Sequence, residues 1–269
     1  MTGAPRPTIS DVSHGRGVLL IEHELSVLGR ILGAMSSPGE RAETDRDALD
    51  GWADLAGNAP GIGVAHEAAR RRQADGIGTD RSWRVGADGE VRVAEVLGEL
   101  TVPSWWDRLR RRPVGWRVLH SVPLLDARGR GRGDIDHVLI GPPGVVTINT
   151  KHHRAGRLEL DGDTLVVNGR STDYVRKARL EALTAGEMLR AALVDAGQPT
   201  LAGRLVVRPL LAVVGGRLLV SGWPVGVTVV MTRQLVPVLR TMPAALDTDD
   251  VDVVFAVARR SVTWTAPTR

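Results

Sequence analysis

The chain has 269 residues, a formal net charge of +4 and no cysteine. This length suits one large domain, or one domain with a smaller appendage. The lack of cysteine excludes disulfides, cysteine-based zinc sites and thiol catalysis. Because the chain has only one Phe and one Tyr, we expect a core of aliphatic side chains, as in buried strands flanked by helices.

The positive charge comes almost entirely from arginine. Among the 35 basic residues, only Lys151 and Lys177 are lysines. The sequence pI of about 10.4 favours a polyanionic partner. An excess of arginine, however, raises the pI without any role in nucleic-acid binding. A lysine in this chain is a stronger candidate than usual for chemistry, because lysine can lose its proton when its environment changes and arginine cannot.

The first eighty residues are expected to lie outside the main domain. Residues 1–38 predict a flexible tail, and residues 39–80 predict a helical extension that is broken at Asn58-Ala-Pro-Gly61. The apolar run at 18–21 is too short for a secretory signal. The apolar stretch at 209–231 contains glycines and an arginine, which indicates buried strands rather than a membrane span of roughly 20 apolar residues. We therefore expect a cytoplasmic protein without a membrane partner.

The first strongly periodic segment begins at Asp88. Residues 88–100 carry apolar side chains at helical spacing, which predicts an amphipathic helix. Asp88 is the expected N-cap. Glu90 then falls in the first turn, where a negative charge suits the helix dipole. A basic connection containing tryptophan leads to a first strand at 116–122.

The most informative stretch predicts a β-hairpin. Its two strands are expected at 134–140 and 145–151, joined by the four-residue loop Gly141-Pro-Pro-Gly144. Antiparallel pairing across this loop places Ile140 opposite Val145. The same register then extends outward along both strands.

This register brings polar residues together. It places Asp136 opposite Asn149 and Asp134 opposite Lys151, all on one face of the sheet, while His137 interrupts the other face as a core histidine. Buried charges must be paired or bind a metal. One interpretation is a structural ion pair between Asp134 and Lys151. The other is a site for a hard cation such as Mg²⁺, with Lys151 close enough to neutralise phosphate charge.

The later segments complete an α/β pattern. They predict a second hairpin at 157–160 and 164–167, a long helix at 173–196, buried strands at 205–214 and 225–231, and short helices at 233–240 and 249–259. Neither lysine follows a glycine, which excludes a P-loop. The glycines at 129–133 lead into a strand, which does not support a Rossmann fingerprint.

Three motifs together resemble the nuclease-related domain (NERD) family, which is related to the PD-(D/E)xK restriction-endonuclease-like nucleases. They are Gly86-Ala-Asp-Gly-Glu90, Gly133-Asp-Ile-Asp-His-Val-Leu-Ile-Gly-Pro-Pro-Gly144 and Ile148-Asn-Thr-Lys151. The resemblance is close over residues 82–195, and the later strands and Trp264 resemble actinobacterial members. It implies an α/β fold with a restriction-endonuclease-like mixed β-sheet flanked by helices. The nuclease-like core would span residues 81–200 and be completed by 201–269, after the N-terminal helical extension.

The resemblance also implies a site. Glu90, Asp136, Asn149 and Lys151 would be catalytic, and Mg²⁺ or Mn²⁺ would be held by Glu90, Asp136, Asn149 and the backbone carbonyl of Thr150. The family usually has Glu where Asn149 stands in this chain. An amide oxygen can bind a cation but brings no negative charge, so metal affinity should be weaker. An Asn149→Glu variant is therefore expected to gain activity.

Four more residues are candidates for contacts to phosphate or nucleic acid. They are His152, His153, Arg176 and Lys177. The alternative is that the two histidines form a solvated strand end and the two cations a solvated helical face.

The leading hypothesis is a metal-dependent nuclease that hydrolyses DNA phosphodiester bonds in DNA processing or repair. Asn149 favours a first alternative, a catalytically weak or inactive module that binds nucleic acid. A second alternative is a stress-associated interaction protein that assembles through its N-terminal helices. The sequence leaves the oligomeric state open.

Overall fold

The computed structural model describes residues 51–62, 80–103, 105, 109 and 115–266. The expected tail at 1–38 and most of the expected helical extension lie outside these residues. Trp52–Arg269 form one structural unit. No helix in the described part of the chain is long and apolar enough to cross a membrane.

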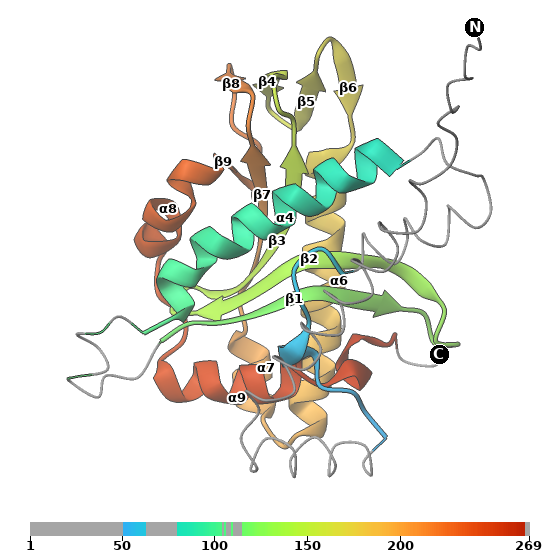
Figure 1. The fold of residues 1–269 in the computed structure, drawn as a ribbon. Helices are drawn as coiled ribbons and strands as arrows, with labels where there is room; N and C mark the ends of the chain where they lie inside the picture. Colours follow the sequence, from blue (N-terminus) through green and yellow to red (C-terminus); the bar gives the residue numbers. More distant parts are fainter. Residues whose placement is uncertain (1–50, 63–79, 104, 106–108, 110–114, 267–269) are drawn as a thin grey trace, which may run out of the picture. The chain divides into compact units, whose positions relative to one another are not determined.

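A five-stranded mixed sheet forms the centre of this unit, in the order β1-β2-β3-β7-β9 (Figure 1). The first three strands pair antiparallel, whereas β3, β7 and β9 run parallel. The apolar runs of β7 and β9 suit parallel strands that are covered on both faces. The strands are β1 (Arg117–Leu125), β2 (Gly131–Gly141), β3 (Gly144–His152), β7 (Val207–Val214) and β9 (Thr228–Met231).

The predicted hairpin register is confirmed near the turn. Ile140 pairs with Val145, and Gly141 pairs with Gly144, so the loop contains two residues rather than four. Gly144 has φ +101°, and a Cβ atom there would lie 2.4 Å from a backbone oxygen of Val206, so the turn requires glycine. The backbone of Val206, directly before β7, therefore packs against the turn.

The register does not extend as far as predicted. The β2–β3 ladder ends at the pair His137–Ile148, so the predicted pairs of Asp136 with Asn149 and Asp134 with Lys151 do not form. Beyond this point β3 bonds to β7 on its other side, while β2 continues along β1. The two strands of the hairpin diverge because each follows a different neighbour.

Helices cover both faces of the sheet (Figure 1). On one face, α4 (Asp80–Thr101) and α8 (Leu235–Thr241) share a buried apolar cluster with β3 and β7. On the other face, α6 (Tyr174–Asp195) and α9 (Thr248–Ala258) pack against β1, β2 and β3. The prediction of a mixed α/β fold with flanking helices is confirmed.

The predicted start of the first helix was wrong. Helix α4 begins at Asp80 rather than Asp88, so Asp88 is not an N-cap and Glu90 lies in the middle of the helix. Gly86 and Gly89 are weak helix formers that obscured the earlier start in the sequence. Contact of this part of α4 with β3 outweighs that weak preference.

A second, smaller sheet has the order β6-β5-β4-β8. Its strands are β4 (Arg157–Asp161), β5 (Thr164–Val167), β6 (Arg170–Thr172) and β8 (Arg217–Val220). The predicted hairpin of β4 and β5 is confirmed, and its apolar side chains pack on the first turns of α6. The sequence did not reveal β6, β8 or the short helix α7 (Pro199–Arg204). The two strands are mostly exposed and lack the buried alternation that identifies a strand.

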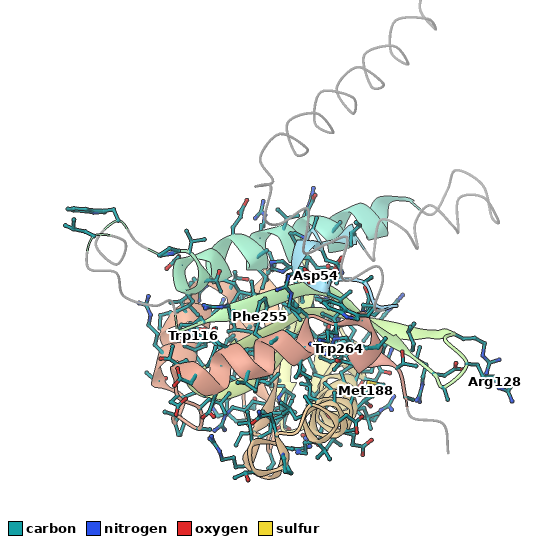
Figure 2. The ribbon with its side chains drawn as sticks, turned by 90° about the horizontal axis from the view of Figure 1, so that it is seen from below. Asp54, Trp116, Arg128, Met188, Phe255 and Trp264 are labelled. Atoms are coloured by element: carbon teal, nitrogen blue, oxygen red, sulfur yellow. The ribbon has the colours of Figure 1, made fainter. Side chains whose placement is uncertain are left out.

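Residues near both ends of the described chain share the core. Leu55, Met188 and Trp264 belong to one buried apolar cluster. Figure 2 labels Met188 and Trp264, and also Asp54, which directly precedes Leu55. Leu55 lies in the 3-10 helix η1 (Leu55–Gly57), and Trp264 in η3 (Ser261–Trp264), which follows α9. Asp54 forms an ion pair with Arg259, and the Leu55 amide donates to the carbonyl of Arg259. Residues 52–55 of the expected extension therefore pack against the C-terminal elements.

Candidate active site

A close approach of α4 to β3 positions the first acidic residue. A Cβ atom at Gly89 would lie 2.8 Å from the Cβ of His152 and 3.3 Å from Cγ2 of Thr150. The ring of His152 also contacts the backbone carbonyl of Val85 at 2.7 Å. Gly89 thus lets the helix backbone lie directly on β3. The next residue, Glu90, is carried toward the place where β2 and β3 diverge.

Asp136 and Lys151 meet at Thr150. The backbone N–H of Thr150 donates to Oδ2 of Asp136 at 2.5 Å, and Nζ of Lys151 donates to the Thr150 carbonyl at 3.0 Å. Asp136 is buried, and this burial raises the pKa of its carboxyl group, while the nearby Lys151 charge opposes that shift. The side chain of Asp136 thus bonds the Thr150 amide beyond the last backbone pair of β2 and β3.

Glu90 approaches the same place from α4. Its side chain is only 3% exposed, and its Oε2 accepts a hydrogen bond from the Gly61 amide at 3.0 Å. Burial, reinforced by repulsion from Asp136 and Asp134, raises the pKa of Glu90 to about 8. The carboxyl groups of Glu90, Asp136 and Asp134 therefore lie close together in a poorly solvated region. A bound cation would reduce the repulsion between them.

A third acid reaches the site from α6, on the other face of the sheet. Nδ2 of Asn149 donates to both carboxylate oxygens of Glu181, at 3.1 and 2.9 Å. Oδ1 of Asn149 is buried and has no hydrogen-bond partner among the described residues. The ammonium of Lys151 lies 5.3 Å from the ring centroid of Tyr174, which is also in α6. Asn149 and Lys151 thus face α6, whereas Thr150 faces α4.

Sequence reasoning missed Glu181. A signal was present, because Glu181 directly precedes Ala182, and the stripe of Ala178, Ala182 and Ala185 is the buried side of α6. An acidic residue at the edge of such a stripe needs a polar partner. The partner is Asn149, which lies 32 positions away in the sequence.

The four candidate phosphate contacts lie around the α6 side and the end of β3. The ring of His153 stacks near that of Tyr174, with centroids 6.2 Å apart, and its Nε2 is buried without a hydrogen-bond partner in the described structure. Arg176 and Lys177 form ion pairs with Asp173 at 3.0 and 3.3 Å. Their role in contacts to nucleic acid stays a prediction.

His137 lies in the core, as expected. It is fully buried, and its Nδ1 is 2.8 Å from Nδ1 of His120. Burial, together with the nearby His120, lowers the pKa of His137 to about 3. Its imidazole is therefore neutral at pH 7, and its Nε2 is buried without a hydrogen-bond partner among the described residues.

The oxygen atoms of the candidate site suit a hard divalent cation in their chemistry. They are the carboxylates of Asp136, Glu90 and Glu181 and the unpartnered Oδ1 of Asn149. A cation would relieve the repulsion among these acids. Within the described residues, however, no three His, Asp or Glu side chains are already grouped as a metal site.

The fold and the site define a class: a mixed α/β domain in which diverging strands hold buried acids and a lysine between two helices. Residues 85–209 match the family model of the nuclease-related domain, which confirms the resemblance of the motifs. The matched part contains Glu90, Asp136, Asn149, Lys151 and Glu181. No curated protein and no solved structure matches the chain.

Proposed function

We propose that the protein is a divalent-metal-dependent nuclease that hydrolyses phosphodiester bonds of DNA, in DNA processing or repair. The observation that carries this proposal is the meeting of Asp136 and Lys151 at the two ends of the Thr150 backbone unit, with the buried Glu90 close by. The nuclease-related domain supports a nucleic-acid partner and the use of a divalent metal.

The acids of the site would hold Mg²⁺ or Mn²⁺. The proposed ligands are Asp136, Glu90, Oδ1 of Asn149 and the carbonyl of Thr150. When bound, such a cation supplies Lewis-acid stabilisation and lowers the pKa of a bound water. The first requirement for binding is that Glu90 gives up its proton, which its raised pKa opposes at neutral pH.

Lys151 would stabilise the charge that develops on the phosphate. Hydrolysis joins a water oxygen to phosphorus and breaks one phosphorus–oxygen ester bond, and negative charge accumulates on the non-bridging oxygens. The Thr150 carbonyl and the Tyr174 ring hold the ammonium of Lys151 next to Asp136. His152, His153, Arg176 and Lys177 are the proposed contacts to neighbouring phosphates.

Cleavage of supercoiled and linear DNA with Mg²⁺, Mn²⁺ or EDTA tests this function. We expect metal-dependent cleavage by the wild type and its loss in Asp136→Ala and Lys151→Ala. Lys177→Ala is the matched control for lysine removal, and it should weaken DNA affinity without abolishing turnover. Equal cleavage by wild type and Asp136→Ala would indicate a contaminating nuclease and remove the proposal.

A second candidate function is a nucleic-acid-binding module without turnover. Asn149 favours it, because the strand that carries Lys151 contributes no acidic side chain. DNA affinity that falls steeply with salt, without metal-dependent cleavage, would select this function. The absence of any DNA affinity would instead select the stress-associated interaction protein.

A further inference from the structure

Strand β3 carries the neutral Asn149 at the position where the nuclease-related family usually has a glutamate. Its sequence from Gly144 to His152 contains no Asp or Glu. The side chain that faces Asn149 from α6 nevertheless belongs to an acidic residue, Glu181. Both of its carboxylate oxygens accept hydrogen bonds from Asn149, at 3.1 and 2.9 Å. An acidic group is therefore present beside this position, but it belongs to the helix.

The contact also orients the amide of Asn149. A carboxylate accepts hydrogen bonds, so the Nδ2 end of the amide must face Glu181. The other end, Oδ1, is buried without a hydrogen-bond partner among the described residues. A buried acceptor without a partner is costly, and a bound cation would satisfy it.

The surroundings of Glu181 are negative. Burial raises the pKa of its carboxyl group, and the charges of Asp136 and Asp134 add to this shift, while Asn149 and Lys151 oppose it. Glu181 of α6 and Asp136 of β2 are thus close enough for their charges to repel each other. A cation between them would compensate both charges.

We propose that Glu181 supplies the acidic group that β3 lacks, so that one divalent cation is held by Asp136 and Glu181 together with Oδ1 of Asn149. This inference rests on the proposed function, because both require the same cation. In this chain the acidic ligand is carried by α6 instead of by β3. Asn149 keeps the neutral oxygen and connects the two elements.

A purely structural role for the contact makes a different prediction. In that case the hydrogen bonds from Asn149 would only fasten α6 to β3. The variant Glu181→Gln separates the two roles, because a glutamine oxygen still accepts a hydrogen bond from Asn149 while the charge is removed. The exposed Glu187 lies on the same helix, so Glu187→Gln is a matched control.

Calorimetric titration of the full chain with Mn²⁺ tests the inference, with thermal unfolding in EDTA measured alongside. We expect Glu181→Gln to lose about tenfold or more in Mn²⁺ affinity, the loss that removal of a supporting group in a metal site typically causes. Its unfolding temperature in EDTA should not fall below that of the wild type. Glu187→Gln should bind as the wild type does. The double variant Asn149→Glu/Glu181→Gln returns the charge to β3 and should regain affinity.

The outcomes separate this inference from the proposed function. Wild-type binding of Mn²⁺ that Glu181→Gln leaves unchanged would overturn the role of Glu181 and leave the nuclease proposal standing. No Mn²⁺ binding and no DNA cleavage by the wild type would overturn both. If Glu181→Gln unfolds, the double variant decides: restored binding supports the inference, and a folded double variant without binding overturns it.

Discussion

The backbone N–H of Gly61 donates a hydrogen bond to the carboxylate of Glu90 at 3.0 Å, across 29 positions of sequence. This contact joins the segment at 51–62 to the middle of α4. It stabilises the charged form of Glu90, but it does not offset burial and the repulsion from Asp136. The acid is therefore held in place but remains difficult to ionise.

The raised pKa of Glu90 predicts a loss of stability with rising pH. The folded state binds this proton more tightly than the unfolded state, so the stabilisation is complete below the ordinary pKa of about 4.5 and disappears as pH rises through about 8. Glu90→Gln removes this dependence. The measured quantity is the unfolding temperature of Glu90→Gln minus that of the wild type, both in EDTA. We expect this difference to be larger at pH 9 than at pH 6 by at least about 2–4 °C, which corresponds to about 1 kcal/mol.

Glu99→Gln, an exposed substitution on the same helix, is the control and should show no such change. A constant difference between Glu90→Gln and the wild type at both pH values would contradict the assignment of a raised pKa. Saturating Mn²⁺ should reduce the loss of wild-type stability at high pH.

Two glycines of α4 should respond in opposite directions to alanine. Gly89→Ala places a methyl group 2.8 Å from the Cβ of His152 and should push α4 from β3, at a cost of about 1–3 kcal/mol. Gly98 has open space around it, so Gly98→Ala should gain up to about 1 kcal/mol from better helix propensity. Urea unfolding measures both. A stabilised Gly89→Ala variant would show that the helix does not lie this close to the strand.

The buried Leu55 predicts that residues 51–62 contribute to the stability of the domain. Leu55→Ala removes a side chain from the main apolar cluster and should cost about 2–5 kcal/mol. The control Ile62→Ala, at an exposed position, should change stability by less than about 0.5 kcal/mol. Equal effects in urea unfolding would mean that this segment does not pack on the core.

Asn149→Glu should behave differently in the presence and absence of metal. The sequence alone predicts a gain of activity, but Glu181 would then face a second carboxylate at hydrogen-bond distance. We expect a lower unfolding temperature than the wild type in EDTA and a larger stabilisation by Mn²⁺. An unfolding temperature in EDTA equal to that of the wild type would show that the two side chains do not meet.

The sequence predicted those parts of the site that depend on local pattern. Alternating polarity and the Gly-Pro-Pro-Gly turn gave the hairpin and its register near Ile140 and Val145, and both are confirmed. The place where the ladder ends could not be predicted, because it depends on how β3 pairs with β7. Glu181 was missed for a similar reason, since its partner Asn149 belongs to a different element. The role of each site residue remains a prediction.

Strand β3 is bonded antiparallel to β2 along its first half and parallel to β7 along almost its whole length. A slip of β3 by one residue would therefore have to break two ladders of different geometry at once. The amides of residues 145–148, where the two ladders overlap, should accordingly be among the slowest to exchange with deuterated solvent. We expect changes to the turn at 142–143 to loosen the tip of the hairpin without moving Thr150 relative to Asp136. The contact between these two residues should therefore tolerate variation in the sequence of the loop.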